Sequence, residues 1–500
     1  MDLSRAPVCW LAAALAAALA GSPSQNTVPQ TARDAAGKLA GANALVEAGK
    51  PEAAIPIYRQ LESAFPNELS IGVNLAVAQF KAGRYHEAAS QCQRLLRMRP
   101  DLFPALLFLG ASQLKVGDAA GAVEALRRAL SISPNDLNAR FMLADALLAS
   151  QQPRDASAQY DLVIHAMPDS PRAWYGLQRS YEAWTIDVRS ELEQQAPASA
   201  QFLALAGGFE LDRLQFARAF QLYRQALALQ PTFRGLHTKL AEVYEQTAHP
   251  DWAAQERAKE SAKECGGASP ECDFVTGRWE QAAASTSTIP DHLYWQALAI
   301  RELALRAQRH LQQELPPSRE SYAAAAEAHE LRARYREAAA TWKEALTLAP
   351  ADSELQRRLA LALCHANDCV SALPLLSALL DKAPSSAELN YLTGLALNAT
   401  RDPLRALPYL EKAVHLDEKF LAAHAALGEA LLEAGSPELA VRHLEASLAE
   451  DENGTRRYQL ATALQAAGKH ERAATVLREY REFLSRSAAN GQSEPLITAP

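Results

Sequence analysis

Aromatic residues, excess positive charge and catalytic motifs are scarce or missing in this sequence. Only 7% of the 500 residues are aromatic, and 58 acidic residues outnumber 50 basic ones, which gives a net charge of −8. A nucleic-acid-binding protein needs a basic stripe to neutralise phosphates, so the charge balance argues against nucleic-acid partners. The motifs H-E-x-x-H, G-x-S-x-G, G-x-x-x-x-G-K-[ST] and G-x-G-x-x-G are absent, and the twelve histidines follow no ligand or triad spacing. We therefore expect no enzymatic activity, no cofactor and no metal site.

The remaining composition is that of a folded chain made of several packing units. Apolar residues make up 49% of the sequence, and 22 glycines and 27 prolines are ordinary numbers for this length. A single hydrophobic core stops growing near about 250–300 residues. The chain must therefore contain several domains or a repeat array, and its alanine-rich runs favour closely packed helices.

The first twenty residues have the pattern of a secretory signal peptide. Arg5 precedes an apolar stretch of 13 residues, Val8 to Ala20, and Ala18-x-Ala20 forms a small-residue cleavage site. Because about 20 apolar residues are needed to cross a bilayer, we expect no membrane span in the mature chain. The alternative is a buried N-terminal helix, against which the abrupt change to Gly21-Ser-Pro-Ser argues. The pattern predicts export, to the periplasm or to the cell exterior.

The cysteines of the predicted mature chain include two close pairs. Cys265 with Cys272 and Cys364 with Cys369 could each close a small loop by a disulfide in an oxidising compartment, and Cys92 stands alone. The alternative is that each cysteine is a small apolar residue packed between helices. A metal site around Cys364 is disfavoured, since no CxxC spacing or second ligand cluster accompanies it.

Proline, alanine and glycine recur with a period of 34 residues. This spacing predicts a helical hairpin in each period: an amphipathic helix, a turn at a glycine or polar residue, a second helix packed through a small alanine, and a proline that ends the pair. The recurring positions are Pro66, Pro100, Pro134 and Pro168; Ala54, Ala88, Ala122 and Ala156; and Gly49, Gly83 and Gly117.

The spacing resembles the tetratricopeptide repeat family. One good copy of the family motif is Leu106-x2-Leu109-Gly110-x2-Gln113 followed by Ala122-x3-Leu126, Ala129 and Pro134, and similar copies run from Tyr322 to Pro350 and from His424 to Leu444. The resemblance is to exported bacterial proteins with many such repeats, and it implies an all-α solenoid of about eleven helical hairpins. The repeats are expected to begin at Ala35, Leu69, Phe103, Leu137, Ala200 and Arg234, and at Arg319, Ser353, Ala387, Leu421 and Gly454.

The repeat register divides the chain into segments. We expect a signal peptide over 1–20, a flexible linker over 21–34, an N-terminal array over 35–263, a loop-rich connector over 264–289, a C-terminal array over 290–485 and a disordered tail over 486–500. Residues 171–199 and 290–318 interrupt the register in similar ways. We interpret them as two shortened helical hairpins, and the alternative is one continuous bent helix in each place.

The resemblance also places a binding groove on the first helices of the repeats, where family members hold a peptide or a helix. The fifth, ninth and twelfth positions of each repeat would face this groove, which runs from apolar to acidic along the chain. The alternative is that the apolar positions pack against adjacent helices and the acids are simply solvated. The candidate residues are Val73, Val77, Phe80, Leu107, Leu114, Phe141 and Asp145, and then Glu242, Glu245, Glu327, Glu330, Arg357, Tyr391, Asn398 and Glu429.

These observations favour a non-catalytic scaffold that binds a protein or peptide outside the cytoplasm. The alternatives are an assembly factor for envelope biogenesis, secretion or polysaccharide export, and, as the weakest, an enzyme with an unrecognised site. The lysine-based clamp that some family members use for a carboxylate is not expected, because Leu39, Val73, Leu107 and Phe141 occupy its lysine position.

Overall fold

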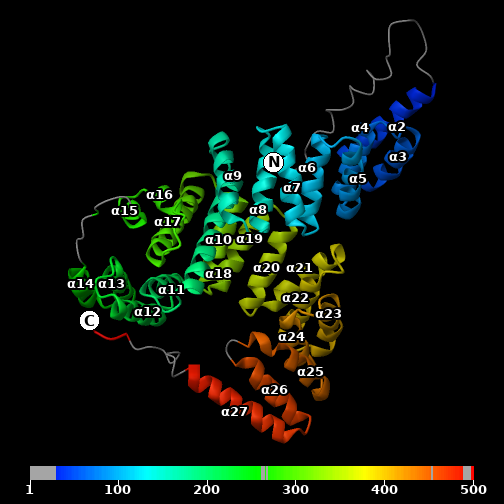
Figure 1. Ribbon diagram of the computed structural model, residues 1–500. Coiled ribbons are helices and arrows are strands. Elements are labelled where there is room, and N and C mark those ends of the chain that lie inside the picture. Colours follow the sequence, from blue (N-terminus) through cyan, green and yellow to red (C-terminus); the bar gives the residue numbers. More distant parts are fainter. Residues whose placement is uncertain (1–29, 261–264, 266–268, 452–453, 488–496, 500) are drawn as a thin grey trace. The chain divides into compact units, whose positions relative to one another are not determined.

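The described part of the protein is helical throughout. The computed structural model describes residues 30–260, 265, 269–451, 454–487 and 497–499, and within these ranges every regular element is a helix (Figure 1). Eleven antiparallel helix pairs can be counted in them. The predicted all-α repeat solenoid is thus confirmed.

The helix pairs follow one another along the sequence, with one extra long helix before α11 and another before α18. The pairs are α2 (Gln30–Glu47) with α3 (Pro51–Ala64), α4 (Leu69–Lys81) with α5 (Tyr85–Met98), α6 (Phe103–Lys115) with α7 (Ala119–Ile132), α8 (Leu137–Ala149) with α9 (Pro153–Ala166), α11 (Ala200–Asp212) with α12 (Phe216–Leu229), α13 (Leu236–Gln246) with α14 (Pro250–Lys259), α18 (Arg319–Leu331) with α19 (Tyr335–Leu348), α20 (Ser353–His365) with α21 (Cys369–Lys382), α22 (Ala387–Ala399) with α23 (Pro403–Leu416), α24 (Leu421–Glu433) with α25 (Pro437–Ser447), and α26 (Thr455–Ala466) with α27 (His470–Ser487).

The first helices begin where the repeat register predicts. Eight of them start at the predicted residue, and α13 and α26 start within two residues of it. Local chemistry explains the starts, because side chains of N-capping residues accept backbone N–H groups that have no partner within the helix. Asp136 caps α8 in this way, Ser318 caps α18 and Ser386 caps α22. Proline occupies the first turn of several second helices, where its missing N–H is not needed.

The turn inside each pair has the same backbone conformation. One residue adopts a positive φ there, and it is glycine in five of the pairs, as at Gly83 with φ of 78°. Six other pairs reach the same conformation with a residue that is not glycine, including Leu214 at 61° and Ala333 at 53°. The hairpin geometry therefore imposes a left-handed turn even where the sequence offers no glycine, at a cost of about 1–2 kcal/mol.

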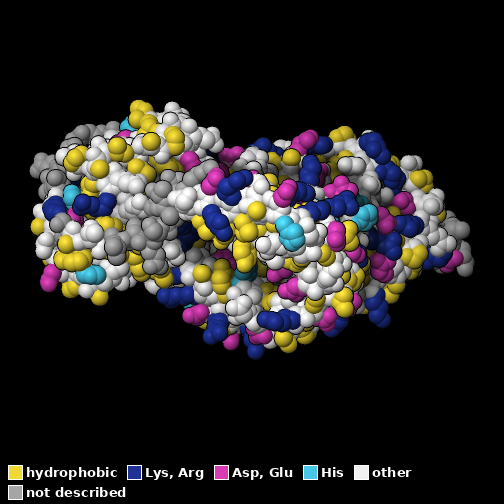
Figure 2. Space-filling view, turned by 90° about the horizontal axis from the view of Figure 1, so that it is seen from below, with side chains coloured by type: hydrophobic (Ala, Val, Ile, Leu, Met, Phe, Trp, Pro, Cys, Tyr) yellow, Lys and Arg dark blue, Asp and Glu magenta, His cyan; other side chains and the backbone are white. Residues whose placement is uncertain are grey.

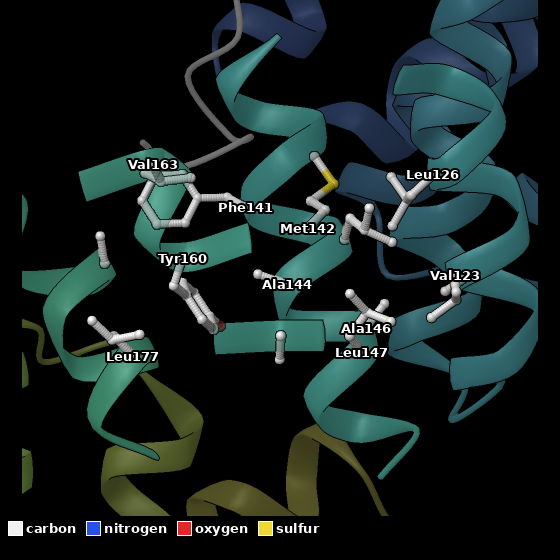
Figure 3. Packing of buried hydrophobic residues seen from close by; sticks show 14 of the residues in the cluster. Val123, Leu126, Phe141, Met142, Ala144, Ala146, Leu147, Tyr160, Val163 and Leu177 are labelled. Atoms are coloured by element: carbon white, nitrogen blue, oxygen red, sulfur yellow. The ribbon is translucent and has the colours of Figure 1, made fainter. Parts of the chain in front are cut away.

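Small residues let the two helices of a pair approach closely. A Cβ added at Gly110 of α6 would lie 2.5 Å from Cγ of Leu126 on α7. Ala122 and Leu126 are both completely buried. Figure 3 shows the next layer of this core, in which the Phe141 ring of α8 lies beside Tyr160 and Val163 of α9, while Met142 of α8 lies on the side of Leu126. The alanine period in the sequence is thus the period of helix contacts.

The two interruptions of the register are long helices, so the interpretation as shortened hairpins is wrong. α10 runs unbroken from Pro171 to Gln195, and α17 runs from Pro290 to Arg309 before a π-helical turn over His310–Glu314. Neither helix contains an internal proline, and Gly176 of α10 is the only glycine in the two helices. Without a turn signal the amphipathic pattern continues as one helix, which was the alternative.

The chain forms two compact units. The first comprises the described residues of 1–187 together with 300–310, and the second comprises those of 188–299 together with 311–500. α10 and α17 contribute residues to both units. The predicted connector contains two short helices, α15 (Pro270–Val275) and α16 (Trp279–Ala283).

Several sequence expectations fall at or beyond the edges of the described residues. The predicted signal peptide lies outside them, as does most of the linker over 21–34, whose last five residues are helical in α2. α27 continues to Ser487, inside the segment predicted as a disordered tail. Among the described helices, none is both long and apolar enough to cross a membrane.

Candidate functional site

The apolar groove candidates of the first unit contribute to the cores between successive repeats. Val73 and Phe141 are each only 5% exposed, so they offer little surface to a partner. The other four candidates, Val77, Phe80, Leu107 and Leu114, are half-buried at the edges of these cores. Phe80 packs edge-on against Phe108 with ring centroids 5.7 Å apart. The first helices therefore keep a partly exposed apolar edge.

Asp145 on α8 belongs to a polar cluster that joins three helices of the first unit. Its carboxylate accepts a hydrogen bond from the hydroxyl of Tyr160 on α9 and forms an ion pair of 2.5 Å with Arg172 on α10. The Arg172 guanidinium also lies over the Phe141 ring, 4.9 Å from its centroid. Burial raises the pKa of Tyr160, and the negative charge of Asp145 adds to this effect. Asp145 is thus already paired, and the position of Arg172 was not found from the sequence.

The glutamates of α18 are also paired. Arg358 of α20 forms ion pairs of 3.2 Å with Glu327 and 3.4 Å with Glu330. The indole Nε1 of Trp342 donates a hydrogen bond of 2.7 Å to Glu330. In this cluster two of the predicted acidic groove residues share one guanidinium, and the contacts tie α18, α19 and α20 together. Sequence reasoning missed Arg358 because it considered only the fifth, ninth and twelfth positions of each repeat.

The remaining charged candidates of α13 and α20 have ionic partners as well. Arg357 forms ion pairs of 2.5 Å with both Glu354 and Glu388, and these carboxylates raise the pKa of its guanidinium. The α13 candidates pair in the same way, Glu242 with Lys239 at 2.8 Å and Glu245 with Arg257 at 2.7 Å.

Glu429 of α24 differs from these acids. The structure records no ion pair or hydrogen bond for its side chain within the described residues, and the side chain reaches solvent. Desolvation by the surrounding protein nevertheless raises the pKa of Glu429, and repulsion from Glu433 raises it further.

The neighbouring helix α22 carries the last two groove candidates. The Tyr391 ring packs against Phe420 at a centroid distance of 4.9 Å, and burial raises the pKa of its hydroxyl. The Asn398 amide donates a hydrogen bond of 3.0 Å to the carbonyl of Ala426 on α24, which links the two first helices. Tyr391, Asn398 and Glu429 therefore belong to adjacent first helices of the second unit.

The two predicted cysteine pairs are brought together, but as free thiols. A hydrogen bond with Cys272 raises the pKa of Cys265, and Arg234 donates a hydrogen bond of 3.3 Å to the Cys265 sulfur. In the other pair, the Cys369 thiol lies 3.7 Å from the carbonyl oxygen of Cys364. Burial raises the pKa of the Cys364 thiol, and a hydrogen bond with Cys369 raises it further. The disulfides remain a prediction.

Several polar clusters of the second unit had no signal in the sequence. Glu256 is completely buried, and desolvation is the largest single influence and raises its pKa. Lys259 at 2.9 Å and His237 at 2.5 Å together outweigh it, so the pKa of Glu256 is lowered. His424 and His443 face each other with Nδ1 atoms 3.0 Å apart. Groups of three or more side chains suited to hold a metal ion are absent from the part of the chain that the structure describes.

The surface charges are mixed in sign. On the face seen in Figure 2, basic and acidic side chains alternate with apolar ones. This distribution agrees with the many Arg–Glu pairs between neighbouring helices, such as Arg59 with Glu87 at 2.6 Å and Arg84 with Glu52 at 2.6 Å.

Comparison with known proteins relates the chain to helical repeat proteins. Two family models, each described as tetratricopeptide repeat, match residues 113–180 and residues 39–103, 73–136, 324–387, 366–419 and 391–455. Among curated proteins, 133 residues are 29% identical to the Hsp70-Hsp90 organizing protein of Triticum aestivum, covering 26% of this chain and 23% of that protein. A stretch of 196 residues is 26% identical to Protein O-mannosyl-transferase TMTC3 of Homo sapiens, covering 37% of this chain and 21% of that protein. The chain thus spans less than a quarter of the length of these relatives.

Similar solved structures are also helical repeat proteins. A tetratricopeptide repeat protein from Parabacteroides merdae is 13% identical with a TM-score of 0.32, and the match covers 66% of this chain and 99% of that one. MamA is 17% identical with a TM-score of 0.30, covering 36% and 98% of the two chains. YrrB, described as a TPR protein with an unusual peptide-binding site, is 21% identical with a TM-score of 0.28, covering 32% and 84%.

Proposed function

Because this chain belongs to the tetratricopeptide repeat family, we propose that it is a non-catalytic scaffold that binds a protein or peptide along the first helices of its repeats. The observation that carries the proposal is the succession of these helices, most of which keep partly exposed side chains at groove positions; on α11 these positions are buried. In the first unit most of them are apolar, as at Phe80 and Leu107. In the second unit they include a carboxylate without an ionic partner among the described residues, Glu429.

The charges of the second unit narrow the chemistry of the partner. Glu327 and Glu330 share the single positive charge of Arg358, which weakens their attraction for a partner's positive charge. Glu429 has no such partner in the described structure, and Glu433 adds to its negative potential. A lysine or arginine of the partner would supply the missing positive charge, which favours a basic side chain opposite α24.

The binding test compares two glutamates on neighbouring repeats. Glu429→Gln should retain less partner than the wild type when the tagged chain is incubated with an extract of its own cells, and added salt should weaken wild-type binding. Glu411 is the matched control, because it is an exposed acid on the second helix α23. Equal retention by both variants and the wild type would contradict the role of Glu429.

We further propose that the protein works outside the cytoplasm. The support is the sequence of residues 1–20, with its basic start, short apolar stretch and Ala18-x-Ala20. The intact-mass spectrum of protein from fractionated cells should show a chain that begins at Gly21 in the fraction outside the cytoplasm. A chain that retains Met1 and stays in the cytoplasm would contradict export.

A further inference from the structure

A short segment far along the sequence contacts the helices of the second unit. The hydroxyl of Tyr244, on α13, donates a hydrogen bond of 2.7 Å to the main-chain carbonyl oxygen of Thr498. The two residues are 254 positions apart and belong to the same compact unit. The acceptor is a backbone atom, so the contact does not depend on the threonine side chain.

Tyr244 sits in an aromatic environment built from three helices. Its ring lies 5.7 Å from the ring of Phe220 on α12 and 5.6 Å from that of Trp252 on α14, measured between centroids. Trp252 in turn stacks on His249 at 4.2 Å. We call these four residues the Tyr244 site. Burial raises the pKa of Tyr244, with a further contribution from Glu256, so the hydroxyl remains protonated and can donate.

The hydrogen-bond partner of Tyr244 differs from those of two other buried tyrosines. Tyr58 bonds to Asn43 at 2.6 Å and Tyr160 bonds to Asp145, and in each case the acceptor belongs to the same helix pair. Tyr244 is completely buried, yet its recorded acceptor within the described residues comes from the remote segment 497–499. With residues 497–499 in place the hydroxyl is shielded from water, and the Thr498 carbonyl supplies its acceptor, since a buried hydroxyl without one costs about 1–3 kcal/mol.

The Tyr244 site is separate from the groove positions of the same helix. Successive residues of an α-helix are turned by about 100°, which places Tyr244 roughly 120° around α13 from the mean direction of Thr238, Glu242 and Glu245. The contact therefore stands independently of the proposed binding along the first helices.

We propose that the Tyr244 site binds an extended peptide through a main-chain carbonyl, and that residues 497–499 occupy this site as an internal competitor. Recognition of a backbone carbonyl tolerates different side chains, while the aromatic rings suit an apolar residue beside it, such as the half-buried Ile497. A segment tethered to the same chain acts at an effective concentration of about 1 mM, so an external peptide must displace it.

The experiment uses a fluorescent peptide with the sequence of residues 493–500 and measures its anisotropy. A variant that stops after Ser487 keeps α27 whole and lacks the internal competitor. It should bind the peptide saturably and at least tenfold more tightly than the intact chain does. Adding Tyr244→Phe to this variant should weaken binding about fivefold, the effect of one neutral hydrogen bond. Tyr458→Phe is the control, because Tyr458 is exposed on α26.

Three results would overturn the proposal. The first is that the shortened variant does not bind the peptide at about 1 mM. The second is that the shortened and intact chains bind it equally well. The third is that Tyr244→Phe does not change the affinity of the shortened variant. A second measurement on the intact chain does not depend on the deletion. Elastase should cleave within 497–499 faster in Tyr244→Phe than in wild type or Tyr458→Phe, and equal rates would also overturn the proposal. None of these results bears on Glu429 binding, so the two proposals fail separately.

Discussion

Replacing Gly110 with alanine should destabilise the pair α6–α7, although the same exchange in an open helix stabilises a protein. The new Cβ would lie 2.5 Å from Leu126 Cγ and 3.0 Å from both of its Cδ atoms. Leu126 is completely buried, and the nearest atom is its branch point, so the side chain cannot yield by moving only its end. Overpacking costs about 1–3 kcal/mol, which exceeds the gain of about 1 kcal/mol from removing a helical glycine. The net loss in the stability of the pair α6–α7 should reach about 2 kcal/mol.

The assay is native-state hydrogen exchange, which reports each helix pair separately. Whole-chain melting would mix the pairs, because stability in a repeat array comes from neighbouring contacts. Gly41→Ala in α2 is the matched control: no heavy atom lies within 4 Å of its added Cβ, so α2 should gain up to about 1 kcal/mol. In the double variant Gly110→Ala, Leu126→Ala, the added methyl group enters the space left by the leucine side chain. The double variant should therefore lose less stability than Leu126→Ala alone. If Gly110→Ala slows exchange in α6 as Gly41→Ala does in α2, the packing argument is refuted.

Three further predictions concern the turns, the histidines and the cysteines. Leu214→Gly should stabilise the α11–α12 pair by up to about 1 kcal/mol in hydrogen exchange, because it relieves a left-handed backbone at φ of 61°, and a loss would contradict this strain. Burial, followed by His424, lowers the pKa of His443, so stability present above about pH 6.5 should fall as the pH drops toward the lowered pKa. The opening free energy of α25 should therefore decrease as the pH falls, and His443→Gln should make this decrease smaller. An equal pH dependence in the variant and the wild type would contradict the role of His443. Oxidation of Cys265 and Cys272 to a disulfide should protect residues 264–290 from proteolysis, and reductant should reverse this, whereas identical cleavage patterns would remove the predicted bridge.

The repeat architecture was predictable because each helix pair carries its own local signals. The N-capping Asp136 and Ser318, the alanine at the helix crossing and the closing proline recur at one phase, so eight first helices begin at the predicted residue. The two register interruptions show where this reasoning fails. Neither α10 nor α17 has an internal turn signal, and the similarity between the two segments came from residues that a continuous helix accommodates equally well.

The candidate binding residues were less predictable than the fold. Their helices and repeat positions follow from the register, but the partner of each side chain depends on neighbouring repeats. Arg358 crosses from α20 to the glutamates of α18, and Arg172 crosses from α10 to Asp145 on α8. No periodic pattern encodes such a contact, and none relates Tyr244 to Thr498. The left-handed residues that are not glycine, such as Ala333, likewise follow from hairpin geometry imposed by packing.

Site-specific photo-crosslinking tests the central claim, that the first helices of the repeats bind a protein or peptide partner. Benzoylphenylalanine would replace Leu107 on α6 or Glu429 on α24, and, as matched positions on second helices, Thr341 on α19 or Glu411 on α23; all four side chains are at least partly exposed. Illumination in intact cells, followed by mass spectrometry of the products, should give a discrete partner adduct from the first-helix positions and none from the second-helix positions. Adducts only from the second helices, or none from Leu107 and Glu429 while the variants remain folded, would contradict the account.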